Sequence, residues 1–191
     1  MATMTVGSPS RHRFTAHEYF RMGETGVLSR DARVELLEGQ LIDMPPIGSA
    51  HASVVDQLGD LLYDALEGSA IVRRQQPVLL DEHSAPQPDL AVAVKRDDYY
   101  RRSHPCAGDV LLVVEVSDST LAFDRDVKGA LYARAGIPEF WVIDIDGARV
   151  TRFASPNNGA YAASAVFAAH DSIEARVFTD VRIPLSAIFS G

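Results

Sequence analysis

Two carboxylates set in apolar strands are the residues of this sequence most able to do chemistry. Asp89 opens the apolar run 90–94, and Glu115 interrupts the valine-rich run 110–116. The second run is typical of a strand buried on both faces, and a buried ionised carboxylate should be paired, hydrogen-bonded or bound to a metal. Two acids on adjacent strands would suit one divalent cation.

Three other residues could join these acids. Lys128 lies on a helix predicted after Glu115, and Glu35 stands in a short apolar segment that precedes a turn. His51 falls in the first turn of another predicted helix, where it could cap the helix, donate to a phosphate or tune a nearby carboxylate. For His51 a purely structural role is equally open.

Each of the other candidates also has an ordinary structural explanation. Asp89 could belong to a turn, and Glu115 could face water from an edge strand. Lys128 could form a solvent-exposed ion pair with Asp124, which lies four residues earlier on the same helix. Glu35 could be the outward residue of a half-buried strand. The residue types alone leave both explanations open.

Charge restricts the ways in which the chain could contact a polyanion. The formal net charge is -8 and the pI is about 5.1, which argues against broad charge-driven binding of nucleic acid. A local basic segment remains, and it could contact phosphates or form only a solvated loop. Its candidate phosphate-binding residues, with two tyrosines between them, are Arg96, Arg101 and Arg102.

Size and composition predict one globular domain. The chain has 191 residues, of which 47% are hydrophobic, so we expect a flexible leader at 1–13 and a single domain at 14–191. The one cysteine excludes an internal disulfide, and no Cys or His cluster has zinc-site spacing, so any metal site would use oxygen ligands. No apolar run approaches the ~20 residues of a spanning helix, and we expect a cytoplasmic location.

The N-terminal part predicts a short helix and a hairpin. Thr15 and Glu18 have the spacing of a capping box, which begins a helix that runs through Met22. Two short apolar segments, 34–37 and 41–44, lie on either side of a Glu-Gly pair. That pattern is typical of a β-hairpin.

The rest of the chain predicts a mixed α/β fold. From Ser49, apolar residues recur at three- and four-residue steps, which indicates an amphipathic helix that Ser49 caps and Gly68 ends. The run 110–144 predicts a strand–helix–strand crossover. The other predicted elements are one or two strands at 71–80, strands at 89–94, 149–153, 161–167 and 175–178, the crossover helix at 124–135, its second strand at 140–144 and a helical turn after Pro184. We expect the aromatic residues Tyr132, Phe140 and Trp141, which fall in helix–strand packing positions, to lie in the core and not to stack on bases.

Taken in order, these candidates resemble a known nuclease pattern. The series Glu35, Pro88-Asp89, Glu115 and Lys128 is similar to the PD-(D/E)xK nuclease superfamily, and more closely to the Uma family, over residues 14–190. The segments that carry the resemblance are VELLEGQLIDMPP, His51, PQPDLAVAV, LLVVEVSDST and DRDVKGALYARAGIPEFWVID. In the simple motif the lysine follows the glutamate by two residues, where this chain has Ser117, so the resemblance assigns that role to Lys128.

The resemblance implies a restriction-endonuclease-like fold, a mixed sheet flanked by helices with extra β-hairpins. It also implies Mg²⁺-dependent hydrolysis of phosphodiester bonds in nucleic acid, with DNA as the expected substrate and Mn²⁺ as a substitute metal. Asp89 and Glu115 would bind the metal with a main-chain carbonyl. Lys128 would orient or help deprotonate the attacking water, and Glu35 would complete the acidic cluster.

Two functions of other classes stay open. One is a nuclease-like module that binds nucleic acid or a protein partner without cutting it. The other is a dimeric scaffold joined through the loop 95–102. We expect a homodimer, which is compatible with cleavage because a two-fold axis would present two sites to two strands. The sequence has no nucleophile elbow, P-loop or dinucleotide-binding motif, so those enzyme classes lose their usual support.

Overall fold

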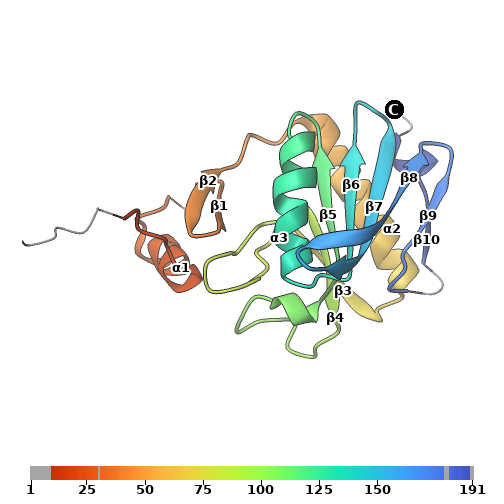
Figure 1. Cartoon of the computed structure of the whole chain (residues 1–191). Helices are drawn as coiled ribbons and strands as arrows, with labels where there is room; N and C mark the ends of the chain where they lie inside the picture. Colours follow the sequence, from red (N-terminus) through yellow and green to blue (C-terminus); the bar gives the residue numbers. More distant parts are fainter. Residues whose placement is uncertain (1–9, 30, 179–180, 190–191) are drawn as a thin grey trace, which may run out of the picture.

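The centre of the molecule is a six-stranded mixed β-sheet between two helical layers (Figure 1). The computed structural model describes residues 10–29, 31–178 and 181–189. All neighbouring strands run antiparallel except β5 and β6, which are parallel. In sheet order the strands are β3 Ala70–Arg74, β4 Leu90–Val94, β5 Val110–Ser117, β6 Glu139–Asp144, β7 Arg149–Asn157 and β8 Ala160–Ala168.

Helix α2, Ser49–Leu66, covers one face of this sheet. Its apolar stripe, spaced three and four residues apart, is buried against the strands and contributes to the largest core of the protein. The helix begins one residue earlier than predicted, because Gly48 is the N-cap and Ser49, the predicted cap, is already helical. It ends at Leu66 with Glu67 as the C-cap, and Gly68 follows with φ 75°.

The crossover between β5 and β6 covers the opposite face, and it confirms the predicted strand–helix–strand unit. Its helix starts with a π-helical segment, Phe123–Lys128, and continues as α3, Gly129–Arg134. It stops before Gly136, whose φ of 79° is readily adopted by glycine. The wider winding of a π segment changes the direction of its side chains, and such segments often occur at functional sites.

A smaller lobe precedes the sheet in the chain and lies beside it (Figure 1). Helix α1, Ala16–Thr25, has the predicted capping box between Thr15 and Glu18 and runs three residues beyond the predicted end. The hairpin is β1 Val34–Leu37 with β2 Gln40–Asp43, as predicted. The two elements share a core of their own. The predicted leader 1–13 falls mainly outside the described residues, and at its end the Arg13 side chain donates to the Glu38 carbonyl.

Two predicted strands differ from the structure. The run 71–80 forms β3 only to Arg74, because Gln75 has a φ of 50° and residues 78–80 bond to 84–86 and 105–107 instead of extending the ladder. The predicted strand at 175–178 is wrong, because the Ala175 amide bonds to the Val181 carbonyl and the chain reverses there. The C-terminal hairpin is instead β9 Ser172–Glu174 with β10 Arg182–Pro184, and α4 Ser186–Phe189 is the helical turn predicted after Pro184.

The described part of the chain contains no helix that is both long enough and apolar enough to cross a bilayer. The large aromatic residues of the crossover are in the core as expected: Tyr132, Phe140 and Trp141 are completely buried. The mixed α/β fold with additional hairpins is therefore confirmed, and the end of β5 lies beside the start of β4.

Candidate active site

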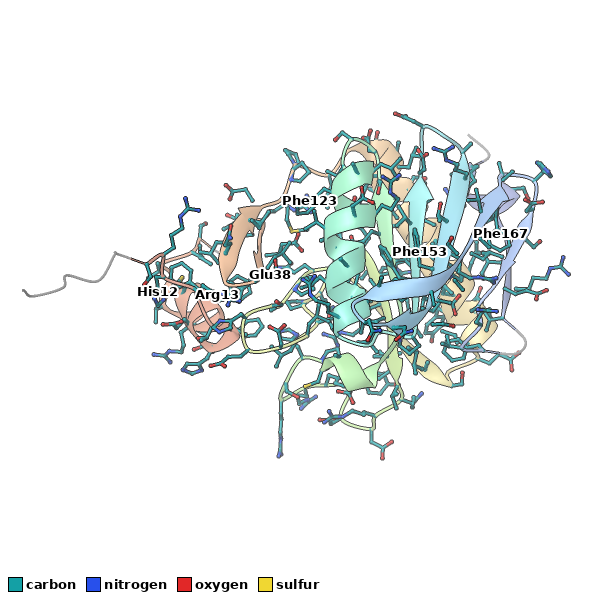
Figure 2. All side chains as sticks on the ribbon, in the orientation of Figure 1. His12, Arg13, Glu38, Phe123, Phe153 and Phe167 are labelled. Carbon is teal, nitrogen blue, oxygen red and sulfur yellow. The ribbon has the colours of Figure 1, made fainter. Side chains whose placement is uncertain are left out.

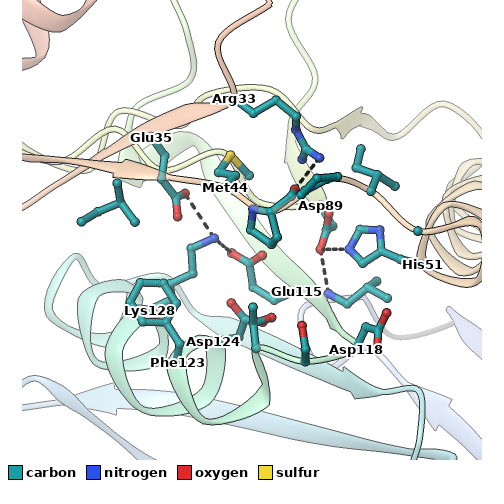
Figure 3. Close-up of a pocket in the computed structure, with 18 of the residues that line it drawn as sticks. Arg33, Glu35, Met44, His51, Asp89, Glu115, Asp118, Phe123, Asp124 and Lys128 are labelled. Atoms are coloured by element: carbon teal, nitrogen blue, oxygen red, sulfur yellow. Dashed lines mark hydrogen bonds and ion pairs between the residues drawn. The ribbon is translucent and has the colours of Figure 1, made fainter.

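A cavity of about 290 Å³ lies where β5 ends and β4 begins (Figure 3). Antiparallel pairing of these two strands places the start of β4 beside the end of β5. The β1–β2 hairpin and the residues after it form one wall, and the start of α2 and the π-helical segment form the others. Five of the residues predicted from sequence line this one cavity: Glu35, His51, Asp89, Glu115 and Lys128.

Lys128 bridges two of the acids. Its Nζ lies 2.9 Å from Glu115 Oε1 and 3.2 Å from Glu35 Oε2 (Figure 3). The three side chains are 3–4% exposed, so neither an outward-facing Glu35 nor a water-facing Glu115 occurs. The solvent-exposed pair of Lys128 with Asp124 does not form either, because Asp124 is buried and accepts from the hydroxyls of Ser117 and Thr120.

Asp89 is fixed to the end of β5. Its Oδ2 accepts the main-chain N–H of Val116 at 2.8 Å and lies 3.1 Å from His51 Nε2. The other oxygen, Oδ1, accepts from the Gln75 side chain at 3.3 Å. Asp89 is therefore more than a turn residue. It links the start of β4 to the end of β5 through Val116, and it contacts the first turn of α2 through His51.

The site perturbs the ionisation of its residues. Burial raises the pKa of Glu115 to about 8, and the carboxylates of Asp89, Asp124 and Glu35 add to this effect while Lys128 opposes it. Burial also disfavours the charged form of Lys128, but Glu115 and Glu35 outweigh it and raise the pKa of Lys128 above its ordinary value. The acidic neighbours of Lys128 thus favour its protonated form.

His51 has one partner and one free nitrogen. The hydrogen bond with Asp89 raises the pKa of His51, although its partial burial acts in the opposite direction. Its Nδ1 is buried and has no hydrogen-bond partner within the described ranges. The contact with Asp89 favours the interpretation of His51 as a residue that tunes a carboxylate over that of a helix cap.

Tyr132 is a site residue that the sequence assigns only to the core. Its hydroxyl donates to Glu115 Oε1 at 2.6 Å, in complete burial. Burial, followed by the charges of Glu115 and Glu35, raises the pKa of Tyr132 well above its ordinary value, so the phenol stays a donor. One signal was available in the sequence, because Tyr132 follows Lys128 by four residues and so lies on the same helix face.

A second missed residue, Gln87, ties the hairpin to the start of β4. Its main-chain N–H donates to Glu35 Oε2 at 3.0 Å, and its side chain donates to the Val34 carbonyl at 2.9 Å and to the Tyr19 hydroxyl at 2.8 Å. Gln87 lies between two prolines and directly before Pro88-Asp89. Glu35 and Asp89 are therefore positioned by the same short segment.

The donors fit a hard cation that needs few protein ligands. Within the described residues no group of three or more His, Cys, Asp or Glu is arranged to hold a metal by itself. Asp89, Glu115 and the main chain at Val116 nevertheless line the same cavity and offer only oxygen donors. Mg²⁺ prefers oxygen ligands and usually keeps several waters, so two carboxylates and a carbonyl can suffice.

The basic segment lies away from the acids. It follows β4, whereas Asp89 precedes β4, so the length of that strand separates Arg96, Arg101 and Arg102 from the cavity. Arg96 forms a bidentate pair with Asp98, at 3.0 and 2.9 Å, and its guanidinium lies over the Tyr100 ring at 4.6 Å. The structure thus does not bring these arginines to the acids, and a phosphate contact by them stays a prediction.

Comparison with solved structures identifies the class of fold. The chain resembles a protein described as a putative nuclease belonging to DUF820 from Anabaena variabilis ATCC 29413, with a TM-score of 0.64. The two share 14% sequence identity, and the match covers 82% of this chain and 89% of the other. At that identity the likeness establishes the fold, which is the restriction-endonuclease-like fold that the sequence predicts.

Comparison of the sequence identifies the family. The Uma2 family, described as "Putative restriction endonuclease", matches residues 16–186. The chain therefore belongs to the Uma2 family, as its motifs predict. None of the curated proteins matches the chain. Together, family and fold support a nuclease.

Proposed function

We propose that this protein is a Mg²⁺-dependent endonuclease that hydrolyses phosphodiester bonds in DNA, with Mn²⁺ as a substitute metal. One observation carries the proposal. Glu35, Asp89, Glu115 and Lys128 come from four different segments of the chain, and all line one cavity. Three of them are carboxylates crowded beside accessible space, an arrangement that costs stability unless a cation or a reaction uses it.

Asp89 and Glu115 would hold the metal, with the carbonyl of Val116. Bound Mg²⁺ would supply stabilisation of the charge on the scissile phosphate and lower the pKa of the attacking water. Both defined polar contacts of Glu115 use Oε1, so its second oxygen is the one we assign to the cation. The hydrogen bond from Val116 and the contact with His51 would hold Asp89 in position.

Lys128 would act as a cation and not as a base. Its carboxylate neighbours keep it protonated, so its ammonium would orient the attacking water and offset phosphate charge. In the reaction the water oxygen bonds to phosphorus and one phosphorus–oxygen ester bond breaks. The water loses a proton to Glu35 or to solvent, and the leaving oxygen gains one. No other co-reactant is needed.

The alternative is a module that binds nucleic acid or a protein partner without cutting. One observation favours it, namely that Lys128 pairs with two of the buried carboxylates and so compensates part of their charge. A homodimer and a cytoplasmic location are compatible with both functions and stay predictions.

Cleavage of circular DNA separates the two functions. Wild type with Mg²⁺ or Mn²⁺ should convert supercoiled plasmid to nicked or linear forms, and EDTA should stop it, because the site needs its cation. Glu115→Gln should be inactive, whereas Glu139→Gln, which changes a buried glutamate outside the cavity, should cut normally. Cleavage that persists in EDTA or in Glu115→Gln would contradict the proposal. Activity limited to linear DNA would point to an exonuclease.

A further inference from the structure

Part of the cavity lining is apolar. We call this part the apolar wall; it comprises residues of β2, the chain just after the hairpin and the first residue of the π-helical segment, and its members are Ile42, Met44, Pro45, Pro46, Ile47 and Phe123. Ile47 is 40% exposed although it is a large hydrophobic residue, and Phe123 is half-buried. Apolar side chains offer phosphate oxygens no favourable contact. They do suit the flat face of a nucleobase, because bases stack on aromatic and apolar side chains.

The reactive groups lie at the bottom of the cavity. The side chains of Glu115 and Lys128 are 4% exposed, and that of Asp89 is 9% exposed. A phosphate can reach them only if the strand that carries it enters the cavity. Pockets that enclose a small ligand typically measure about 300 to 1,000 Å³, so a cavity of about 290 Å³ has room for one nucleotide-sized group and not for a base pair.

The charge of the cavity also disfavours a double strand. Six carboxylates line it against one arginine and one lysine, and the six are Glu35, Asp43, Asp89, Glu115, Asp118 and Asp124. The arginine is engaged as well, because Arg33 donates to the Pro45 carbonyl at 2.8 Å (Figure 3). Two rows of phosphates would be repelled here, whereas one phosphate accompanied by a cation would not.

We propose, on the basis of the proposed function, that the substrate is unpaired DNA: one unstacked nucleotide enters the cavity, its base against Phe123 and Ile47 and its phosphate beside Asp89 and Glu115. Single strands, frayed ends and single-stranded tails supply such a nucleotide without cost. A regular duplex must first unpair and unstack it, which takes a few kcal/mol. The apolar wall thus selects the state of the strand, and the acids provide the chemistry.

The test compares three fluorescent DNAs that share one sequence, with the full chain and Mn²⁺. They are a single strand of about 20 nucleotides, which exceeds the usual site size, its blunt duplex, and the duplex with an unpaired tail. We expect the single strand and the tail to be cut at least about tenfold faster than the paired region, as the unstacking cost requires. Equal or faster cutting of the blunt duplex would overturn this inference and leave the proposed function standing. No cutting of any DNA, while Mn²⁺ binds, would contradict both.

Variants of the wall complete the test. Phe123→Ala should slow cutting of the single strand by about tenfold, because one lost base–aromatic contact has that size, and should leave Mn²⁺ affinity unchanged. Phe123→Leu keeps most of the apolar volume without the ring, so it should slow cutting of the single strand by a smaller factor. It replaces the alanine variant in the test if that variant does not fold. Val166→Ala, which truncates a 66% exposed residue on β8 outside the cavity, is the matched control. A Phe123 variant that cuts the single strand like wild type would overturn the assignment of the base site.

Discussion

Two buried glutamates on neighbouring parallel strands have opposite surroundings. Glu139 opens β6, and its carboxylate accepts from the Trp141 indole at 2.7 Å and from two main-chain N–H groups, of Arg176 and Val177, at 2.7 and 3.1 Å. Both oxygens are satisfied by neutral donors. Glu115 on β5 instead contacts Lys128 and the Tyr132 hydroxyl through Oε1 alone, and lines a cavity among other carboxylates.

The comparison shows that burial by itself does not make a carboxylate functional. Burial raises the pKa of both glutamates, so a perturbed pKa does not separate them. What separates them is their surroundings. Neutral donors satisfy both carboxylate oxygens of Glu139, whereas other carboxylates lie near Glu115 beside an open cavity. Protein interiors are close-packed, so open space beside a buried carboxylate is informative. Figure 2 shows the side chains of the described residues on the same fold.

The largest expected effect on stability comes from removing the cation of the crowded site. Lys128→Met would leave Glu35 and Glu115 buried without a counter-charge, and breaking a buried ion pair in this way costs about 3 to 5 kcal/mol. Urea unfolding at pH 8 measures the loss, and adding Glu115→Gln to this variant should recover part of it. A loss below about 1 kcal/mol, the size of a surface pair, would show that the cluster is not charge-compensated by Lys128.

Glu139→Ala should come next. It leaves the Trp141 indole and two main-chain donors unsatisfied in the interior, and each such donor costs about 1 kcal/mol or more. We expect a loss of about 3 kcal/mol in the free energy of unfolding with no change in Mn²⁺ affinity. A loss of metal binding in the folded variant would mean that Glu139 is not the purely structural residue of the comparison.

The pH dependence of stability sharpens the difference for Glu115. Its pKa is about 8 in the folded protein and 4.5 as an ordinary glutamate, so between these values the folded state binds a proton that the unfolded state has released. Its contribution to stability therefore falls as pH rises through this window, by at most about 1.4 kcal/mol per pH unit. Glu115→Gln cannot titrate, so urea unfolding from pH 5 to 9 should show a flatter fall than wild type. Identical slopes would contradict the assignment.

Tyr132→Phe should have the smallest effect. It removes one hydrogen bond to Glu115 and keeps the ring that packs beside Phe140. We expect about 1 kcal/mol lower stability and about tenfold weaker Mn²⁺ binding, the usual order for a residue that orients a metal ligand. Tyr161→Phe, which removes a hydroxyl bonded to the Ile137 carbonyl at 3.0 Å outside the cavity, is the matched control. Equal Mn²⁺ affinity in both variants would exclude a positioning role for Tyr132.

Much of the site could be predicted because strand patterns determine it. A proline-aspartate pair before one apolar run and a glutamate inside the next place two acids on adjacent strands, and β4 and β5 do pair. The lysine could also be assigned to the crossover helix. The ion pairs of Lys128 with Glu35 and Glu115 could not be predicted. The π-helical winding of Phe123–Lys128 sets the direction of the Lys128 side chain, and this winding leaves no simple pattern in the sequence.

Other features depended on contacts between distant segments. Tyr132 has the residue type and the spacing of a core residue, and only the fold shows that its hydroxyl donates a hydrogen bond to Glu115. Gln87 and Gln75 reach Glu35 and Asp89 from irregular chain, which has no periodicity to read. The strand β9 was misplaced by a few residues because short alternating apolar segments near a turn fit more than one register.

The most direct test of the central claim is a calorimetric titration of Mn²⁺ into wild type, Asp89→Asn, Glu115→Gln and the control Glu139→Gln, each shown by circular dichroism to be folded. Asp89 and Glu115 share one cavity, and Glu139 does not line it. We expect a metal site in wild type and in Glu139→Gln, and none in the other two variants. Binding that survives in Asp89→Asn and Glu115→Gln, or that is missing from wild type, would contradict the claim that these two carboxylates form a metal site.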